Sequence, residues 1–214
     1  AKEAALLALQ AARLARTLDD HLLISRVLAN LGFFYHQLGL PRRGLRALDR
    51  CRDHLKASPH DGVAAIEHIH RGVVLLSLGQ HAEAEKALLL ARVIRLRAGD
   101  RGRLPATLID LGRLQKRSGR LDAAETSYSE AMTIAEELKL PELYLAWANL
   151  GELKLHQGEY GEAERLIRQG LGDPQPERRA LGQRNLGALL RRRARLREAL
   201  AVLTECQAGL ATHA

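Results

Sequence analysis

Apolar residues recur at helical spacing along the whole chain, and small and large apolar residues follow one another in a pattern that repeats about every 40 residues. Each copy is anchored on a glycine, and the steps between these glycines are 40, 40, 39 and 36 residues. The anchors are Gly32, Gly72, Gly112, Gly151 and Gly187. A period of this length is typical of a solenoid, in which each unit buries its apolar face only against its neighbours. The pattern therefore predicts an array of helical repeats.

Residues of fixed size occupy fixed offsets from each anchor. Twelve and nineteen residues after the anchor the residue is small, and sixteen residues after it the residue is large. The large residues are Leu48, Leu88, Tyr128, Ile167 and Leu203. We expect the small residues to let two helices approach closely and the large residue to fill the gap between them.

Seven residues after the anchor, four of the five copies carry a second glycine. These are Gly39, Gly79, Gly119 and Gly158, and the fifth copy has Ala194 instead. Glycine readily adopts the positive φ that ends a helix and turns the chain into the next one. Each copy is therefore predicted to be a helix, a turn and a second helix, and the turn at Ala194 is expected to be looser or differently shaped. Pro105 predicts that the first helix of the third copy starts late or is kinked.

The two clearest copies, WANLGELKLHQGEYGEAERLI and LIDLGRLQKRSGRLDAAETSY, resemble the tetratricopeptide repeat, in the form of about 40 residues found in bacterial regulatory proteins and kinesin light chains. The resemblance implies an all-α, right-handed superhelical solenoid of about five and a half repeats that forms one continuous domain. It also implies the sensing or scaffolding part of a larger cytoplasmic regulatory protein of bacteria, acting in signal transduction or transcription regulation. The predicted boundaries are 1–19 for the second helix of a repeat whose first helix is missing, then 20–59, 60–99, 100–139, 140–174 and 175–214 for repeats one to five.

The sequence offers little for catalysis, so we expect no enzyme activity and no cofactor. It contains no glycine-rich phosphate loop and no recognised nucleophile motif. His68 and His70 are two residues apart on a predicted helix and point to nearly opposite sides, so they cannot share a metal ion. Cys51 and Cys206 occupy equivalent small-residue positions, and we expect both thiols to be reduced, buried and structural.

The position two residues before each anchor is polar in every copy. The five residues are Asn30, His70, Asp110, Asn149 and Asn185. In tetratricopeptide repeats, ligand contacts lie on the first helices, so the resemblance implies a ladder that holds the backbone of a peptide. An asparagine amide can both donate and accept hydrogen bonds, as such a ladder requires. The alternative is that this column faces solvent or bonds to the neighbouring repeat.

Residues near this column are expected to give specificity. They are Arg26, Phe33, Gln37, Ile69, Val73, Arg113, Arg117, Glu152 and His156. Phe33, Ile69 and Val73 predict an apolar patch, and Arg113 with Arg117 and nearby Lys116 predicts a basic stretch. Such a face would suit an extended or helical protein segment with apolar anchors at one end and acidic residues at the other.

The formal net charge is +8, and part of this excess is local. Residues 178 to 197 contain eight arginines and no acidic residue. The predicted basic patch consists of Arg184, Arg191, Arg192, Arg193 and Arg195. Aromatic residues make up only 3% of the chain, which leaves little to stack on bases, so an acidic protein partner is favoured over nucleic acid. Self-association through apolar end repeats is a further alternative, and no apolar stretch predicts a membrane span.

Overall fold

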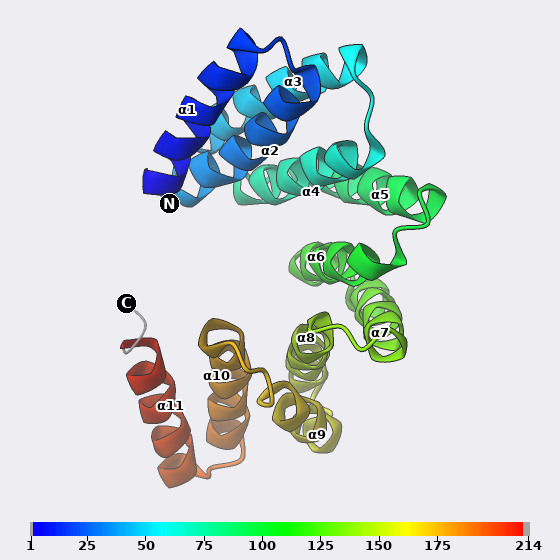
Figure 1. Cartoon of the computed structure of the whole chain (residues 1–214). Helices are drawn as coiled ribbons and strands as arrows, with labels where there is room; N and C mark the ends of the chain where they lie inside the picture. Colours follow the sequence, from blue (N-terminus) through cyan, green and yellow to red (C-terminus); the bar gives the residue numbers. More distant parts are fainter. Residues whose placement is uncertain (1, 212–214) are drawn as a thin grey trace. The chain divides into compact units, whose positions relative to one another are not determined.

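The computed structural model describes the backbone of residues 2–211 and the side chains of these residues except 16, 176, 177 and 209–211 (Figure 1). Over this range the secondary structure is helical, with no strand, which confirms the predicted all-α class. The helices are α1 (Lys2–Thr17), α2 (His21–Gln37), α3 (Pro41–Ala57), α4 (Asp61–Ser77), α5 (His81–Arg97), α6 (Leu104–Arg117), α7 (Leu121–Glu137), α8 (Glu142–Gln157), α9 (Tyr160–Gly170), α10 (Pro176–Arg192) and α11 (Leu196–Ala211), with a short 3-10 helix at Arg101–Arg103.

The chain divides into two compact units, Ala1–Leu114 and Gln115–Ala214, and the division falls inside α6. In the first unit α2 packs against α1, α3 and α4, and α4 packs against α3 and α5 (Figure 1). In the second unit α8 packs against α7, α9 and α10, and α10 packs against α9 and α11. In both units, therefore, the first helix of one pair contacts the first helix of the next, as expected for a solenoid of helix pairs.

Four of the anchor glycines lie directly against the large residue sixteen positions further along. A Cβ atom added to Gly32 would lie 2.6 Å from Leu48 Cγ, and one added to Gly187 would lie 2.8 Å from Leu203 Cγ. Both distances are too short for a methyl group, so only glycine allows this approach of the two helices. The same contact is made at Gly72 with Leu88 and at Gly151 with Ile167. The predicted pairing of small and large residues is confirmed at these four positions.

The turns between paired helices share one conformation. The four glycines seven residues after the anchors have φ between 73° and 85°, and Ala194 has φ 59° in the same left-handed region. The backbone closes the same way in the first and last copies, where Leu40 N donates to Tyr35 O at 2.8 Å and Arg195 N donates to Leu190 O at 2.9 Å. The expectation of a looser or differently shaped turn at Ala194 is therefore wrong, because alanine accepts the left-handed conformation here.

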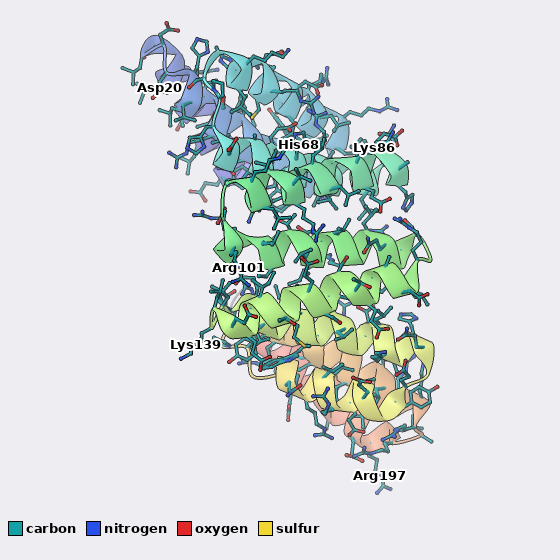
Figure 2. All side chains as sticks on the ribbon, turned by 90° about the vertical axis from the view of Figure 1, so that its right-hand side faces the viewer. Asp20, His68, Lys86, Arg101, Lys139 and Arg197 are labelled. Carbon is teal, nitrogen blue, oxygen red and sulfur yellow. The ribbon has the colours of Figure 1, made fainter. Side chains whose placement is uncertain are left out.

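The residues at the N-termini of α2 and α6 explain where these two helices begin. The Asp20 side chain caps α2 by accepting a hydrogen bond from Leu23 N at 2.8 Å. Pro105 lies in the first turn of α6, where its missing N–H removes no intrahelical bond. The late start predicted from Pro105 is confirmed, because the preceding residues form the 3-10 helix instead. Figure 2 shows Asp20 and Lys139 at turns between consecutive helices.

No helix among the described residues combines enough length and apolarity to cross a membrane.

Candidate peptide-binding faces

In the first unit, His70 connects two first helices. Its Nδ1 lies 2.8 Å from the carbonyl oxygen of Ala29, so α4 bonds to α2. Burial lowers the pKa of His70 below 6.5, which favours the neutral ring with a proton on Nδ1 that donates to this carbonyl. The His70 ring also stacks on Phe33, with ring centroids 5.0 Å apart and planes 21° apart. The column residue of the second repeat is thus fixed by contacts within the unit.

In the second unit, Asn185 makes the equivalent bond. Its Nδ2 donates to the carbonyl oxygen of Ala148 at 3.0 Å, so α10 bonds to α8. Ala29 and Ala148 both lie three residues before their anchors. Asn149 differs, because its Nδ2 donates to Leu145 O in its own helix at 2.7 Å. Asn149 and Asn185 are only 4% and 8% exposed, so this part of the column has a structural use, namely bonding within or between repeats.

Asn30 is the exception in the column. Its side chain is exposed, and no residue in the described part of the chain hydrogen-bonds to its amide. Asp110 is a quarter exposed and lies 3.5 Å from Arg113. Burial raises the pKa of Asp110 to about 6, and the positive charges of Arg113 and Arg95 oppose that rise only in part. Of the five column residues, Asn30 therefore offers the freest hydrogen-bonding group.

Exposed polar groups gather around Asn30 on one side of α2. Arg26, Asn30 and Gln37 are exposed, and Phe33 is half-buried. Their spacing of four, three and four residues places them on one helix face. We define the α2 face as these four residues of α2. On α4, the half-buried His70 stacks on Phe33 of this face, and Val73, three residues further along α4, is also half-buried. Ile69 packs instead against the buried cluster that contains Leu75 and Leu111.

The corresponding face of the second unit is largely occupied by ion pairs. Lys116 Nζ lies 2.6 Å from Glu152 Oε2, and His156 Nε2 lies 3.9 Å from Glu152 Oε1. In the first unit, the Arg113 charge faces Asp110. Arg117 remains exposed. The basic stretch expected from these positions is therefore mostly neutralised by nearby carboxylates.

The predicted basic patch is also partly neutralised. Glu164 of α9 lies 2.7 Å from Arg193 and 3.3 Å from Arg195, and Arg195 also pairs with Glu198 at 2.6 Å. Hydrogen bonding to Arg168, with the charges of Arg195 and Arg193, lowers the pKa of Glu164 despite some burial. These acidic partners lie outside the arginine-rich segment. The composition of the segment alone therefore overestimates the net positive charge on this part of the surface.

Two exposed patch residues on α10 have no hydrogen-bond or ion-pair partner for their side chains among the described residues. They are Arg184 and Arg191. Arg192 is exposed as well, but its Nη1 donates to the Leu155 carbonyl at 3.2 Å. The unpaired positive charge of the patch is thus carried by separate arginine side chains. No contact among the described residues holds two of these guanidinium groups together so that both could bind one phosphate.

Sequence reasoning missed a buried carboxylate in the first unit. The Glu67 side chain is only 2% exposed, and it accepts hydrogen bonds from Arg71 Nε at 2.6 Å and Arg52 Nη2 at 3.4 Å. Arg71 in turn pairs with Asp49 at 2.8 Å. This network joins α3 to α4. A signal was present, because the other copies have small or uncharged residues at the position of Glu67, five before the anchor.

The cysteines behave as predicted. Both thiols are free and buried, and Cys51 Sγ lies 3.2 Å from the Ser25 carbonyl, as Cys206 Sγ lies 3.8 Å from the Ala180 carbonyl. Burial, and secondarily the charge of Glu67, raises the pKa of Cys51 to about 12, so the thiol stays protonated. Within the described residues, no group of three or more His, Cys, Asp or Glu side chains could hold a metal ion.

Two family models, both described as tetratricopeptide repeat, match residues 62–137 and 145–169. These matches identify the two segments as tetratricopeptide repeats, which confirms the family that the sequence predicted. No curated protein matches it in sequence.

Solved structures resemble most or nearly all of the chain. BtubC (BKLC) from P. vanneervenii aligns with a TM-score of 0.79 at 16% identity over 99% of this chain and 91% of that one. A putative kinesin light chain of Podospora anserina gives 0.68 at 17% identity over 88% and 95%. The Rap conjugation gene regulator of plasmid pLS20, solved in complex with the Phr* peptide, gives 0.70 at 18% identity over 84% and 50%. At these identities the likeness establishes the fold.

Proposed function

We propose that this chain is a protein-interaction module that binds an extended segment of a partner protein on the α2 face of its first unit. The observation that carries the proposal is the exposed Asn30 amide, which no described residue engages. An amide that both donates and accepts can pair with the N–H and C=O groups of an extended backbone.

The neighbours of Asn30 suit side-chain recognition. Phe33 is half-buried, and its stacking on His70 holds the ring in place before a ligand binds. A fixed aromatic ring provides apolar contact at a low entropic cost. Arg26, one turn before Asn30, is exposed and positively charged. The preferred segment would therefore carry an apolar side chain close to an acidic one.

The wider setting is proposed by analogy. The Rap regulator shows that a protein of similar fold binds a peptide. We propose that this chain likewise forms the sensing or scaffolding part of a larger regulatory protein in the bacterial cytoplasm. The chain spans about half the length of that regulator, so any output domain would lie in the rest of such a protein.

A displayed library of random peptides selected on the chain would test the proposal. We expect enriched sequences that combine acidic and apolar residues. Binding of a synthetic, fluorescein-labelled copy would be followed by fluorescence anisotropy. Asn30→Ala should weaken binding about fivefold, as expected for the loss of one or two hydrogen bonds, and Phe33→Ala should weaken it more.

Gln207→Ala serves as the matched control, because it removes an exposed amide from α11 in the second unit. It should leave binding unchanged. Enriched peptides that bind equally well to the Asn30 and Phe33 variants, or a selection that yields no binder, would overturn the proposed face.

A further inference from the structure

A hollow of about 320 Å³ lies between α1, α2 and α3 in the first unit. Its lining residues are Leu9, Leu28, Leu31, Tyr35, Arg43, Arg46, Ala47 and Arg50. Leu28, Leu31 and Ala47 are at most 5% exposed and form an apolar floor, while Leu9 is 39% exposed at the edge. A hollow of this kind can receive an apolar side chain.

The hollow lies on the other side of α2 from the α2 face. At about 100° per residue, Leu28, Leu31 and Tyr35 project from one side of the helix, and Asn30 and Phe33 project from the opposite side. A ligand in the hollow would therefore leave the α2 face free.

Three arginines border the hollow along α3. Arg43, Arg46 and Arg50 are spaced by three and four residues, so they share one helix face, and all three are exposed. Within the described part of the chain no carboxylate pairs with them. The two acidic residues of α3 are already engaged, Asp49 by Arg71 and Asp53 by Lys56. The positive charge at this edge is thus uncompensated, in contrast to the predicted basic patch.

The spread of this charge restricts the ligand. Arg43 and Arg50 are seven residues apart, which corresponds to roughly 10 Å along the helix axis. A ligand with negative groups at a similar spacing can pair with both side chains without either one bending toward the other. The best-matched ligand therefore carries several negative groups distributed along its length, around an apolar group that fits the hollow.

We propose that this hollow docks an acidic amphipathic helix of a partner protein. One leucine-sized side chain of the partner enters between Leu9 and Leu31, and carboxylates one turn to either side pair with the arginines of α3. Charge complementarity and an apolar anchor together define the ligand.

The probe is a synthetic alanine-based helical peptide with one central leucine and glutamates three and four residues before and after it. Its binding to the full chain would be measured by fluorescence anisotropy at about 50 mM salt, where charge pairs are weakly screened. Two matched peptides, one with all glutamates replaced by glutamine and one with leucine replaced by alanine, should each bind at least about fivefold more weakly.

Variants of the chain locate the site. Arg46→Gln should weaken binding about threefold, and the triple variant Arg43→Gln, Arg46→Gln, Arg50→Gln at least about tenfold. Arg97→Gln, which removes an exposed arginine of α5, should have no effect. Circular dichroism would confirm that the triple variant stays folded, as expected for exposed positions.

Undiminished binding of the peptide to the triple variant would overturn the proposal, and so would equal binding of the leucine and alanine peptides. A uridine 15-mer that competes with the peptide and binds more tightly would also overturn it, because the arginines would then be assigned to phosphate binding. Asn30→Ala should leave binding of the acidic helix unchanged. Failure of this site is therefore distinguishable from failure of the proposed α2 face.

Discussion

At the scale of single residues, Ala194 holds a conformation that suits glycine better. Its φ of 59° lies in the left-handed region where a Cβ atom is unfavourable. We predict that Ala194→Gly raises the free energy of unfolding by about 0.5–1 kcal/mol, because relief of strain outweighs the added freedom of the unfolded chain. Urea unfolding followed by circular dichroism would measure the change.

The control for this variant is Ala201→Gly, at an exposed position inside α11. There the same substitution should lower stability by about 1 kcal/mol, since glycine is a poor helix former. A loss of stability for Ala194→Gly would show that this turn is not strained.

Asp110 should make stability depend on pH. Its pKa is raised from 3.8 to about 6 in the fold, so folding favours the neutral carboxyl. That favourable contribution is complete below pH 3.8 and is lost as the pH rises through 6. Asp110→Asn should therefore stabilise the chain at about pH 7 by roughly 1–3 kcal/mol and have little effect near about pH 4. Urea unfolding across this range would show it, and a pH-independent difference would contradict the assignment.

The polar column shows which properties of single residues could be predicted from the sequence. The repeat spacing located Asn30, His70 and Asn185 at equivalent positions, and hydrogen bonding to the neighbouring repeat was one of the alternatives for their role. It could not choose between alternatives, because the acceptors are backbone carbonyls 37 to 41 residues away, and any residue type presents a carbonyl.

At the scale of helices, the Glu67 network should contribute to the packing of α3 on α4. Glu67→Ala would leave the Arg71 guanidinium, whose side chain is 14% exposed, without its closest partner. We expect a loss of about 3 kcal/mol, as for the removal of one member of a buried ion pair. Thermal and urea unfolding would measure it.

Glu67→Gln should be milder, because the amide oxygen can still accept from Arg71. Glu83→Ala, at an exposed site of α5, is expected to change stability by less than about 0.5 kcal/mol. An equally small effect of Glu67→Ala would mean that water replaces the carboxylate at no cost.

Helix pairing was predictable because its determinants are local. Gly32 and Leu48 are sixteen residues apart, and their contact follows from size alone. Neutralisation of the basic patch was not predictable, because Glu164 reaches Arg193 across 29 residues, and both ends of that ion pair look like ordinary solvated charges in the sequence.

At the scale of the whole molecule, the spacing of the anchors predicted an array but gave no sign of two compact units. The anchor pattern continues through Gly112 without a break, although the division falls two residues later, inside α6. A regular repeat spacing in the sequence predicts that each repeat contacts its neighbours. It carries no information on how strongly successive repeats are coupled.

The exposed leucines of the N-terminal helix bear on the self-association that the sequence raised as an alternative. Ala5 and Ala12 are buried on one side of α1, whereas Leu7 and Leu14 on the other side are 58% and 62% exposed, and Leu18 in the turn after α1 is 65% exposed. An apolar stripe of this kind favours contact with another apolar surface. We predict that the chain forms dimers or larger species as its concentration rises, measurable by sedimentation velocity.

The double variant Leu7→Glu, Leu14→Glu should remain monomeric, whereas Leu138→Glu, at a single exposed leucine after α7, should behave as the unmodified chain. The net charge of +8 repels like chains, so association through the stripe should strengthen with salt. Docking of an acidic helix on α3 should weaken with salt, because it depends on attraction between opposite charges. Opposite salt responses in one preparation would separate the two surfaces, and association that weakens with salt would assign it to charge pairs instead of the leucines of α1.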